Sequence, residues 1–151
     1  SWILRRGKIG LEDIIIEPEG TLLGKWSVRA ITVMDGEDFK DWKSLLLVAG
    51  GYVINTNMKS GRIIATGSKD LKKIEVYNGG ITCGTDWGSS LTLVEGIPVT
   101  VKIKTQKEIA VWTLNNIGER MRKIPVSSQG DFKVFRIGPE YETLWYEISA
   151  P

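Results

Sequence analysis

The sequence predicts an all-β fold, a two-sheet antiparallel β-sandwich of the jelly-roll kind, and three observations lead to this prediction. Short runs rich in Val, Ile, Thr and aromatic residues recur along the chain, separated by turn sequences such as Asn78-Gly79-Gly80. Several of these runs alternate between apolar and polar residues. No stretch carries the long apolar stripe of an amphipathic helix. Short strands separated by regularly spaced turns are typical of sandwiches and barrels.

Two segments predict half-buried antiparallel strands because they alternate. Val99–Lys104 places apolar β-branched residues on one face and Thr or Lys on the other. Thr143–Ile148 places Trp145 and Glu147 on the face opposite to Tyr146. A strand with one buried and one solvated face shows this pattern. Further strands are predicted at Leu11–Ile16, Leu22–Met34, Arg62–Thr66, Lys73–Tyr77, Leu91–Val94, Ile109–Leu114, Arg122–Val126 and Lys133–Ile137.

The segment Ser44–Met58, SLLLVAGGYVINTNM, runs from apolar residues through a glycine pair to Asn and Thr. This pattern predicts a strand of the sandwich core, with closing amides that organise the following turn. Within Leu22–Met34 the apolar residues change phase near Ala30, which predicts a bulge or a strand covered on both sides. One helical turn is predicted at Glu37–Asp41. With no linker or repeat, residues 1–151 are predicted to form a single domain.

Composition argues against several functions. The chain has no histidine, which removes the commonest general base and the commonest metal ligand. None of the eighteen acidic residues is placed as a buried pair, so we expect no glycosidase chemistry and no enzyme activity. The net charge is +2 and acidic and basic residues are interleaved along the chain, so the sequence shows no basic patch for binding nucleic acid. No run of eighteen apolar residues is present, and we expect no membrane span.

Four stretches carry a resemblance to a known family. These are WILRRGKIGLEDIII from Trp2, ITVMDG from Ile31 followed after eight residues by LLLVAGGYVINTNM, WGSSLTLVEGIPVTVKI from Trp87, and the closing segment GERMRKIPV with FRIGPEYETLWYEI. Together they resemble the C-terminal β-sandwich module, similar to a carbohydrate-binding module, of large secreted glycoside hydrolases. At Trp42 and Asn57 the chain departs from that pattern.

The resemblance implies a non-catalytic, secreted, monomeric module attached to a catalytic glycoside hydrolase domain of the same polypeptide. Its partner would be a β-linked polysaccharide, and a β-glucan such as cellulose or mixed-linkage glucan is expected. The alternative is a structural sandwich that packs on the catalytic domain without binding sugar. Exposed tryptophans would favour the first hypothesis, because the apolar faces of pyranose rings stack on aromatic rings.

Five of the six tryptophans are therefore the candidates for a binding site, and Trp2 on the opening strand is expected to plug the end of the sandwich. Trp42 lies in the charged segment EDFKDWKS, and we expect it to be the exposed stacking platform. Trp87 lies in a loop flanked by small residues, and the sequence favours exposure and burial of its side chain equally. Trp145 points away from the core face of its strand. For Trp26 and Trp112 the neighbouring residues favour core packing. Around Trp112 both faces of the strand are apolar, so the sequence does not show which of them is buried.

No cofactor is expected. A structural calcium ion remains an option that the sequence leaves open, because the loops at Asp35–Asp41 and Asn55–Asn57 could supply oxygen ligands. Neither loop has the ligand spacing of a calcium-binding motif.

Overall fold

The computed structural model describes residues 9–11, 13–21, 26–58, 61–62, 81–82 and 86–150. In these residues most of the chain is β-strand, and every strand pair is antiparallel. The predicted all-β antiparallel sandwich is therefore confirmed. The chain divides into two compact units, the first formed by Ser1–Tyr52 with Glu95–Pro151 and the second by Val53–Val94. The single domain over residues 1–151 stays a prediction.

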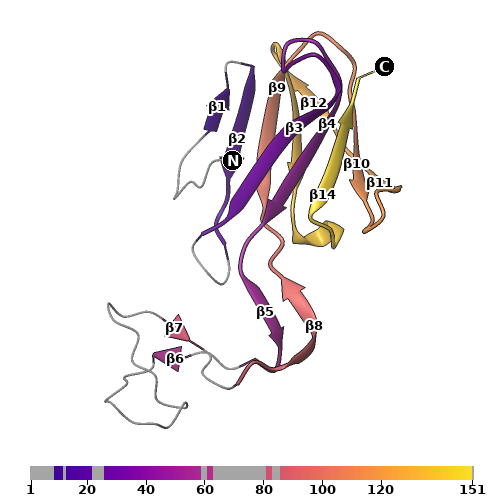
Figure 1. Ribbon diagram of the computed structural model, residues 1–151. Coiled ribbons are helices and arrows are strands. Elements are labelled where there is room, and N and C mark those ends of the chain that lie inside the picture. The colour runs from indigo at the N-terminus through magenta and orange to yellow at the C-terminus, as the bar shows by residue number, and fades with distance from the viewer. Residues whose placement is uncertain are drawn as a thin grey trace. The chain divides into compact units, whose positions relative to one another are not determined.

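The first unit consists of two five-stranded sheets that face each other (Figure 1). Sheet A has the order β11-β10-β14-β4-β3, formed by Arg120–Ile124, Ala110–Leu114, Trp145–Ser149, Trp42–Gly50 and Val28–Gly36. Sheet B has the order β1-β2-β9-β13-β12, formed by Ile9–Leu11, Ile14–Pro18, Val99–Lys104, Phe132–Ile137 and Ser127–Gln129. A single 3-10 turn in the described residues, η1, spans Pro139–Tyr141.

The core lies between the two sheets and is built from the inward side of each alternating strand. Val99, Val101 and Ile103 of β9 are buried, as are Tyr146 and Ile148 of β14. Burying one such side chain contributes roughly 1.5–3 kcal/mol. The alternation predicted for Val99–Lys104 and for Trp145 opposite Tyr146 is thus confirmed, and each strand keeps its other side chains on the outward face.

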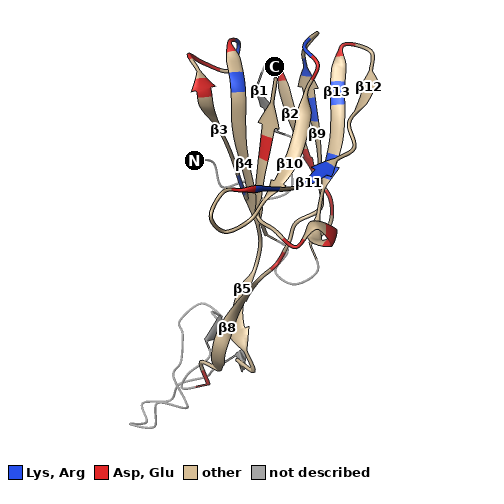
Figure 2. Cartoon of the chain, turned by 90° about the vertical axis from the view of Figure 1, so that its right-hand side faces the viewer, with Lys and Arg blue, Asp and Glu red and all other residues tan. Residues whose placement is uncertain are grey.

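The second unit contains the pairs β5 with β8, formed by Val53–Thr56 and Ser89–Val94, and β6 with β7, formed by Gly61–Arg62 and Ile81–Thr82. All of β8 is exposed, and neither β5 nor β8 contains a charged residue (Figure 2). The segment Ser44–Met58 is therefore a core strand only as far as Gly50, because its second half belongs to this unit. Asn55 ties β5 to β8, since its side-chain oxygen accepts from the hydroxyl of Thr92 at 2.8 Å.

Two local predictions were wrong. Glu37–Asp41 is a chain of bends and not a helical turn, because Asp38 Oδ1 accepts hydrogen bonds from the backbone N–H groups of Lys40 and Asp41. The irregularity of β3 falls between Val33 and Gly36, beyond the predicted position at Ala30. Gly36 has a φ of 124°, and a side chain there would collide with the backbone of Asp41.

Several sequence predictions concern residues outside the described part. Apart from Arg62 in β6, the predicted strands Arg62–Thr66 and Lys73–Tyr77 lie there, as does Trp2. In the part that is described, no helix has the length and hydrophobicity needed to cross a bilayer.

Candidate functional site

The outward face of sheet A carries two tryptophans on neighbouring strands. Trp112 of β10 lies opposite Glu147 of β14, which lies opposite Leu46 of β4. Trp145 is two residues before Glu147 and projects to the same side. Such diagonal neighbours are about 7–8 Å apart. We call this outward surface the tryptophan face and define it by Trp112, Trp145, Glu147, Leu46 and Thr32, which lies opposite Leu46.

A groove of about 520 Å³ opens on the tryptophan face. Trp145 is 38% exposed and forms part of its lining. The other lining residues include Met34, Ser44, Leu46, Asn116 and Glu147. The groove therefore combines an accessible indole ring and apolar walls with several polar groups at its border.

Asn115 and Asn116 are adjacent in the β10–β11 turn but differ in what their side chains do. Asn115 holds the turn, because its Oδ1 accepts from the N–H groups of Ile117 and Glu119 at 3.0 and 2.9 Å. Its Nδ2 also donates to Glu119 Oε2 at 2.8 Å. In the described structure the side-chain amide of Asn116 has no hydrogen-bond partner. The groove thus has one amide ready to donate and accept.

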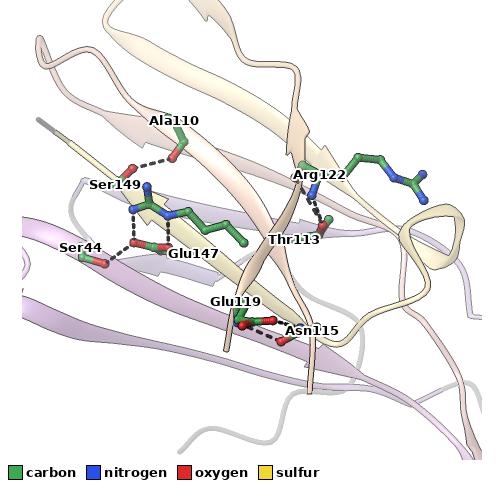
Figure 3. A network of polar contacts seen from close by, with 9 residues as sticks. Ser44, Ala110, Thr113, Asn115, Glu119, Arg122, Glu147 and Ser149 are labelled. Carbon is green, nitrogen blue, oxygen red and sulfur yellow. Dashed lines mark hydrogen bonds and ion pairs between the residues drawn. The ribbon is translucent and has the colours of Figure 1, made fainter. Parts of the chain in front are cut away.

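The carboxylate of Glu147 is held by two neighbours. Arg120 donates to both of its oxygens, from Nε and a terminal nitrogen, each at 2.7 Å. Ser44 Oγ donates to Oε1 at 3.3 Å, so that Glu147 lies between the two (Figure 3). The hydrogen bond from Arg120 lowers the pKa of Glu147, and the same bond raises the pKa of Arg120. The pair stays ionised and adds no net charge to the groove.

Trp112 differs from Trp145 in that cations lie over its ring. The guanidinium carbon of Arg120 is 5.7 Å from the ring centroid, and Lys123 Nζ is 5.8 Å away. Both are within cation–π range. Trp112 is also half-buried. Of the two tryptophans, Trp145 therefore offers the open ring, whereas Trp112 supports charged groups.

The prediction that Trp42 is exposed was wrong. Its side chain is 4% exposed and packs in the core. The reason lies in the β3–β4 ladder, where two register shifts between Val33 and Gly36 change the phase, so that Trp42 and Leu45 both point inward. The charged neighbours of Trp42 face solvent, and Lys107 Nζ lies 5.8 Å from its ring centroid.

The prediction that Trp26 packs in the core was also wrong. Trp26 is exposed, as are Val28 and Ala30, and Ser27 and Arg29 between them are buried. The shared face inferred from the sequence exists, but it is the outward one. Trp87 is 63% exposed and belongs to the second unit. Of the five candidates, Trp112 and Trp145 lie on adjacent strands of sheet A, and Trp26 precedes the edge strand β3 of the same sheet.

Sequence reasoning missed the groove residues Met34 and Asn116 and the ion pair between Arg120 and Glu147. The sequence did indicate the position of Glu147, because it is two residues from Trp145 on the same strand and therefore lies on the same face. The ion pair depends on the register of β10, β11 and β14, which no local pattern specifies.

The described residues contain no group of three or more His, Cys, Asp or Glu side chains placed to hold a metal ion. The two loops considered for calcium, Asp35–Asp41 and Asn55–Asn57, belong to different units. Comparisons with protein-family models, with curated proteins and with solved structures find no match to this chain.

Proposed function

We propose that this chain is a non-catalytic module that binds a β-linked polysaccharide, such as a β-glucan, on the tryptophan face. The observation that carries the proposal is the open ring of Trp145 in a groove bordered by the unpartnered amide of Asn116. In this proposal the module directs an attached, secreted glycoside hydrolase to its substrate and performs no catalysis itself.

The groove has the two properties that sugar binding needs. A pyranose ring has apolar C–H faces, and an indole ring on a rigid sheet can stack against one of them. The strand pair β14–β4 holds Trp145 in place, and Tyr146 beside it is fixed in the core. Asn116 and the hydroxyl of Ser44 lie where they can bond sugar hydroxyls. These features support recognition of a neutral ring.

The alternative function is a structural sandwich that packs on a catalytic domain without binding sugar. Exposed apolar side chains favour it, namely Val28 and Met34 in the first unit and Leu91 and Leu93 in the second. An interface of this kind needs apolar area and little hydrogen bonding at its centre. The polar groups around Trp145 favour the sugar-binding proposal for the tryptophan face.

Affinity electrophoresis and calorimetry with soluble β-glucans test the proposal. Trp145→Ala should weaken binding by about 1–3 kcal/mol, the range for losing a stacking aromatic. The matched control is Trp87→Ala, which removes a more exposed tryptophan from the second unit and should leave affinity within about twofold. If Trp87→Ala abolishes binding and Trp145→Ala does not, the proposed site is wrong. If glucans, mannans and xylans all fail to bind the wild type, the alternative function replaces it.

A further inference from the structure

The tryptophan face has a second feature beside the groove, a lysine without an ionic partner over Trp112. Lys123 lies opposite Trp112 in the β10–β11 pair, and its ammonium group is 5.8 Å from the ring centroid. Within the described residues it makes no ion pair. Its positive charge is therefore available to a ligand on this face.

None of the described carboxylates in the same region forms an ion pair with Lys123. Glu147 is paired with Arg120, whereas Glu119 accepts from the neutral amide of Asn115 in the β10–β11 turn and keeps its charge. Lys123 also lines a hollow of about 370 Å³ together with Glu108 and Lys133, but these two pair with each other at 2.6 Å. Among the described residues no acid thus pairs with Lys123, whereas Arg120 over the same ring is paired with Glu147.

The tryptophan face therefore has two ends of different chemistry. At one end Trp145 and Asn116 form an uncharged groove, and at the other Lys123 presents a cation above a half-buried indole. The neutral Arg120–Glu147 pair lies between them. A ligand that extends from Trp145 to Trp112 crosses from a neutral environment to a positive one.

We propose that the Trp112–Lys123 end is a subsite for an acidic sugar or an acidic substituent, so that the module prefers a β-linked polysaccharide bearing carboxylates. This inference rests on the proposed function and specifies its ligand class. Lys123 donates to the carboxylate of the ligand, and such a charge-assisted hydrogen bond is stronger than a neutral one. Glu147 does not repel the ligand because Arg120 neutralises it.

The test compares two soluble polymers with one backbone, hydroxyethyl cellulose, which is neutral, and carboxymethyl cellulose, which is anionic. The wild type should bind the anionic polymer about tenfold more tightly in low salt, because hydrogen bonds to charged groups are the stronger ones. In about 1 M salt, where the Debye length is about 3 Å, this preference should disappear.

Two substitutions of the same charge type identify the residue responsible. Lys123→Gln should reduce the preference for carboxymethyl cellulose over hydroxyethyl cellulose to less than about twofold. Arg122→Gln is the matched control, because Arg122 is next to Lys123 but its side chain is directed away from Glu147 (Figure 3). Arg122→Gln should keep the preference.

The outcomes separate this inference from the proposed function. If the wild type binds both polymers equally, the acidic subsite is wrong and the proposed function stands. An equal loss of preference in Lys123→Gln and Arg122→Gln also contradicts the subsite, because it would show a general charge effect. If neither polymer binds and mannans and xylans also fail to bind, the proposed function is wrong, and the subsite with it.

Discussion

The outward faces of the two sheets differ, although both cover the same core. On sheet B, Lys102 pairs with Glu17 at 2.8 Å, and Arg136 pairs with Glu19 and Glu140 at 2.9 and 2.6 Å. We call this surface the ion-pair face. Its strands contain no tryptophan. The tryptophan face also has an Arg–Glu pair but adds two indoles, Leu46 and the groove.

The difference favours the proposal that the ion-pair face contacts only solvent, whereas the tryptophan face also binds a ligand. Exposed ion pairs contribute at most about 1 kcal/mol each and keep a surface soluble. Large apolar residues around a groove do not improve solubility, and such patches mark interaction sites. The two indoles and the groove on sheet A therefore support the proposal that a ligand binds on that face.

The largest expected effect is on stability, and it comes from replacing a buried tryptophan rather than an exposed one by alanine. Trp42→Ala should lower the free energy of unfolding by about 3–5 kcal/mol, because Trp42 is buried in the core. Trp145→Ala should lower it by less than about 1 kcal/mol, because that ring is partly exposed. Urea denaturation of both variants measures the contrast. Equal losses would remove the distinction between core and face on which the comparison depends.

These two tryptophans also show how far the sequence could be used. Strict alternation at Val99–Lys104 and Thr143–Ile148 predicted strands, core side and the outward direction of Trp145 correctly, because a regular ladder preserves a two-residue period. At Trp42 the ladder is irregular. The charged residues around Trp42 indicate that its neighbours are exposed, but they do not indicate on which face its own side chain lies. Local pattern cannot reveal a register shift that depends on the partner strand.

Trp26 shows a different limit. Its grouping with Val28 and Ala30 was correct, but the sequence could not say which of the two faces of β3 is buried. The buried side holds Arg29, a residue that hydrophobic pattern places outside. The groove was beyond prediction for a related reason, since it joins Met34, Asn116 and Trp145 across strands that are distant in the chain.

The next effect comes from placing one charge on each face. Leu46→Lys puts an ammonium group into the groove and should weaken binding of a neutral glucan by at least about tenfold. Ile15→Lys makes the matched change on sheet B, where Ile15 faces outward beside Lys102, and should change affinity by less than about twofold. Calorimetry with hydroxyethyl cellulose measures both. Weaker binding by Ile15→Lys would place the ligand on the ion-pair face.

A smaller effect separates two adjacent amides. Asn116→Ala should weaken glucan binding by about 0.5–1.5 kcal/mol, the range of one hydrogen bond, and leave stability unchanged. Asn115→Ala should mainly affect stability, because it removes the hydrogen bonds that hold the β10–β11 turn. It should lower the free energy of unfolding by about 1 kcal/mol. Thermal melts and calorimetry on the same samples distinguish them. If Asn116→Ala binds as well as the wild type, its amide does not contact the sugar.

The smallest effect compares the two Arg–Glu pairs by pH. Hydrogen bonds from arginine lower the pKa of both Glu147 and Glu19. A carboxylate with a lowered folded-state pKa stabilises the protein above its unfolded-state pKa, and this stabilisation is lost as the pH falls through the folded-state value. The difference in unfolding free energy between the wild type and Glu147→Gln should therefore be constant near neutral pH and shrink below the ordinary range of glutamate.

Glu19→Gln should show the same sign of pH dependence but a stronger response to salt. The Glu19 side chain is 42% exposed, whereas that of Glu147 is 20% exposed, and screening weakens exposed pairs most. Each pair is expected to contribute less than about 1 kcal/mol. Urea denaturation across pH in low and high salt measures both. A Glu147 pair that is screened as strongly as the Glu19 pair would show that the groove border is as open to water as the ion-pair face, and would weaken the case for a sheltered binding surface on sheet A.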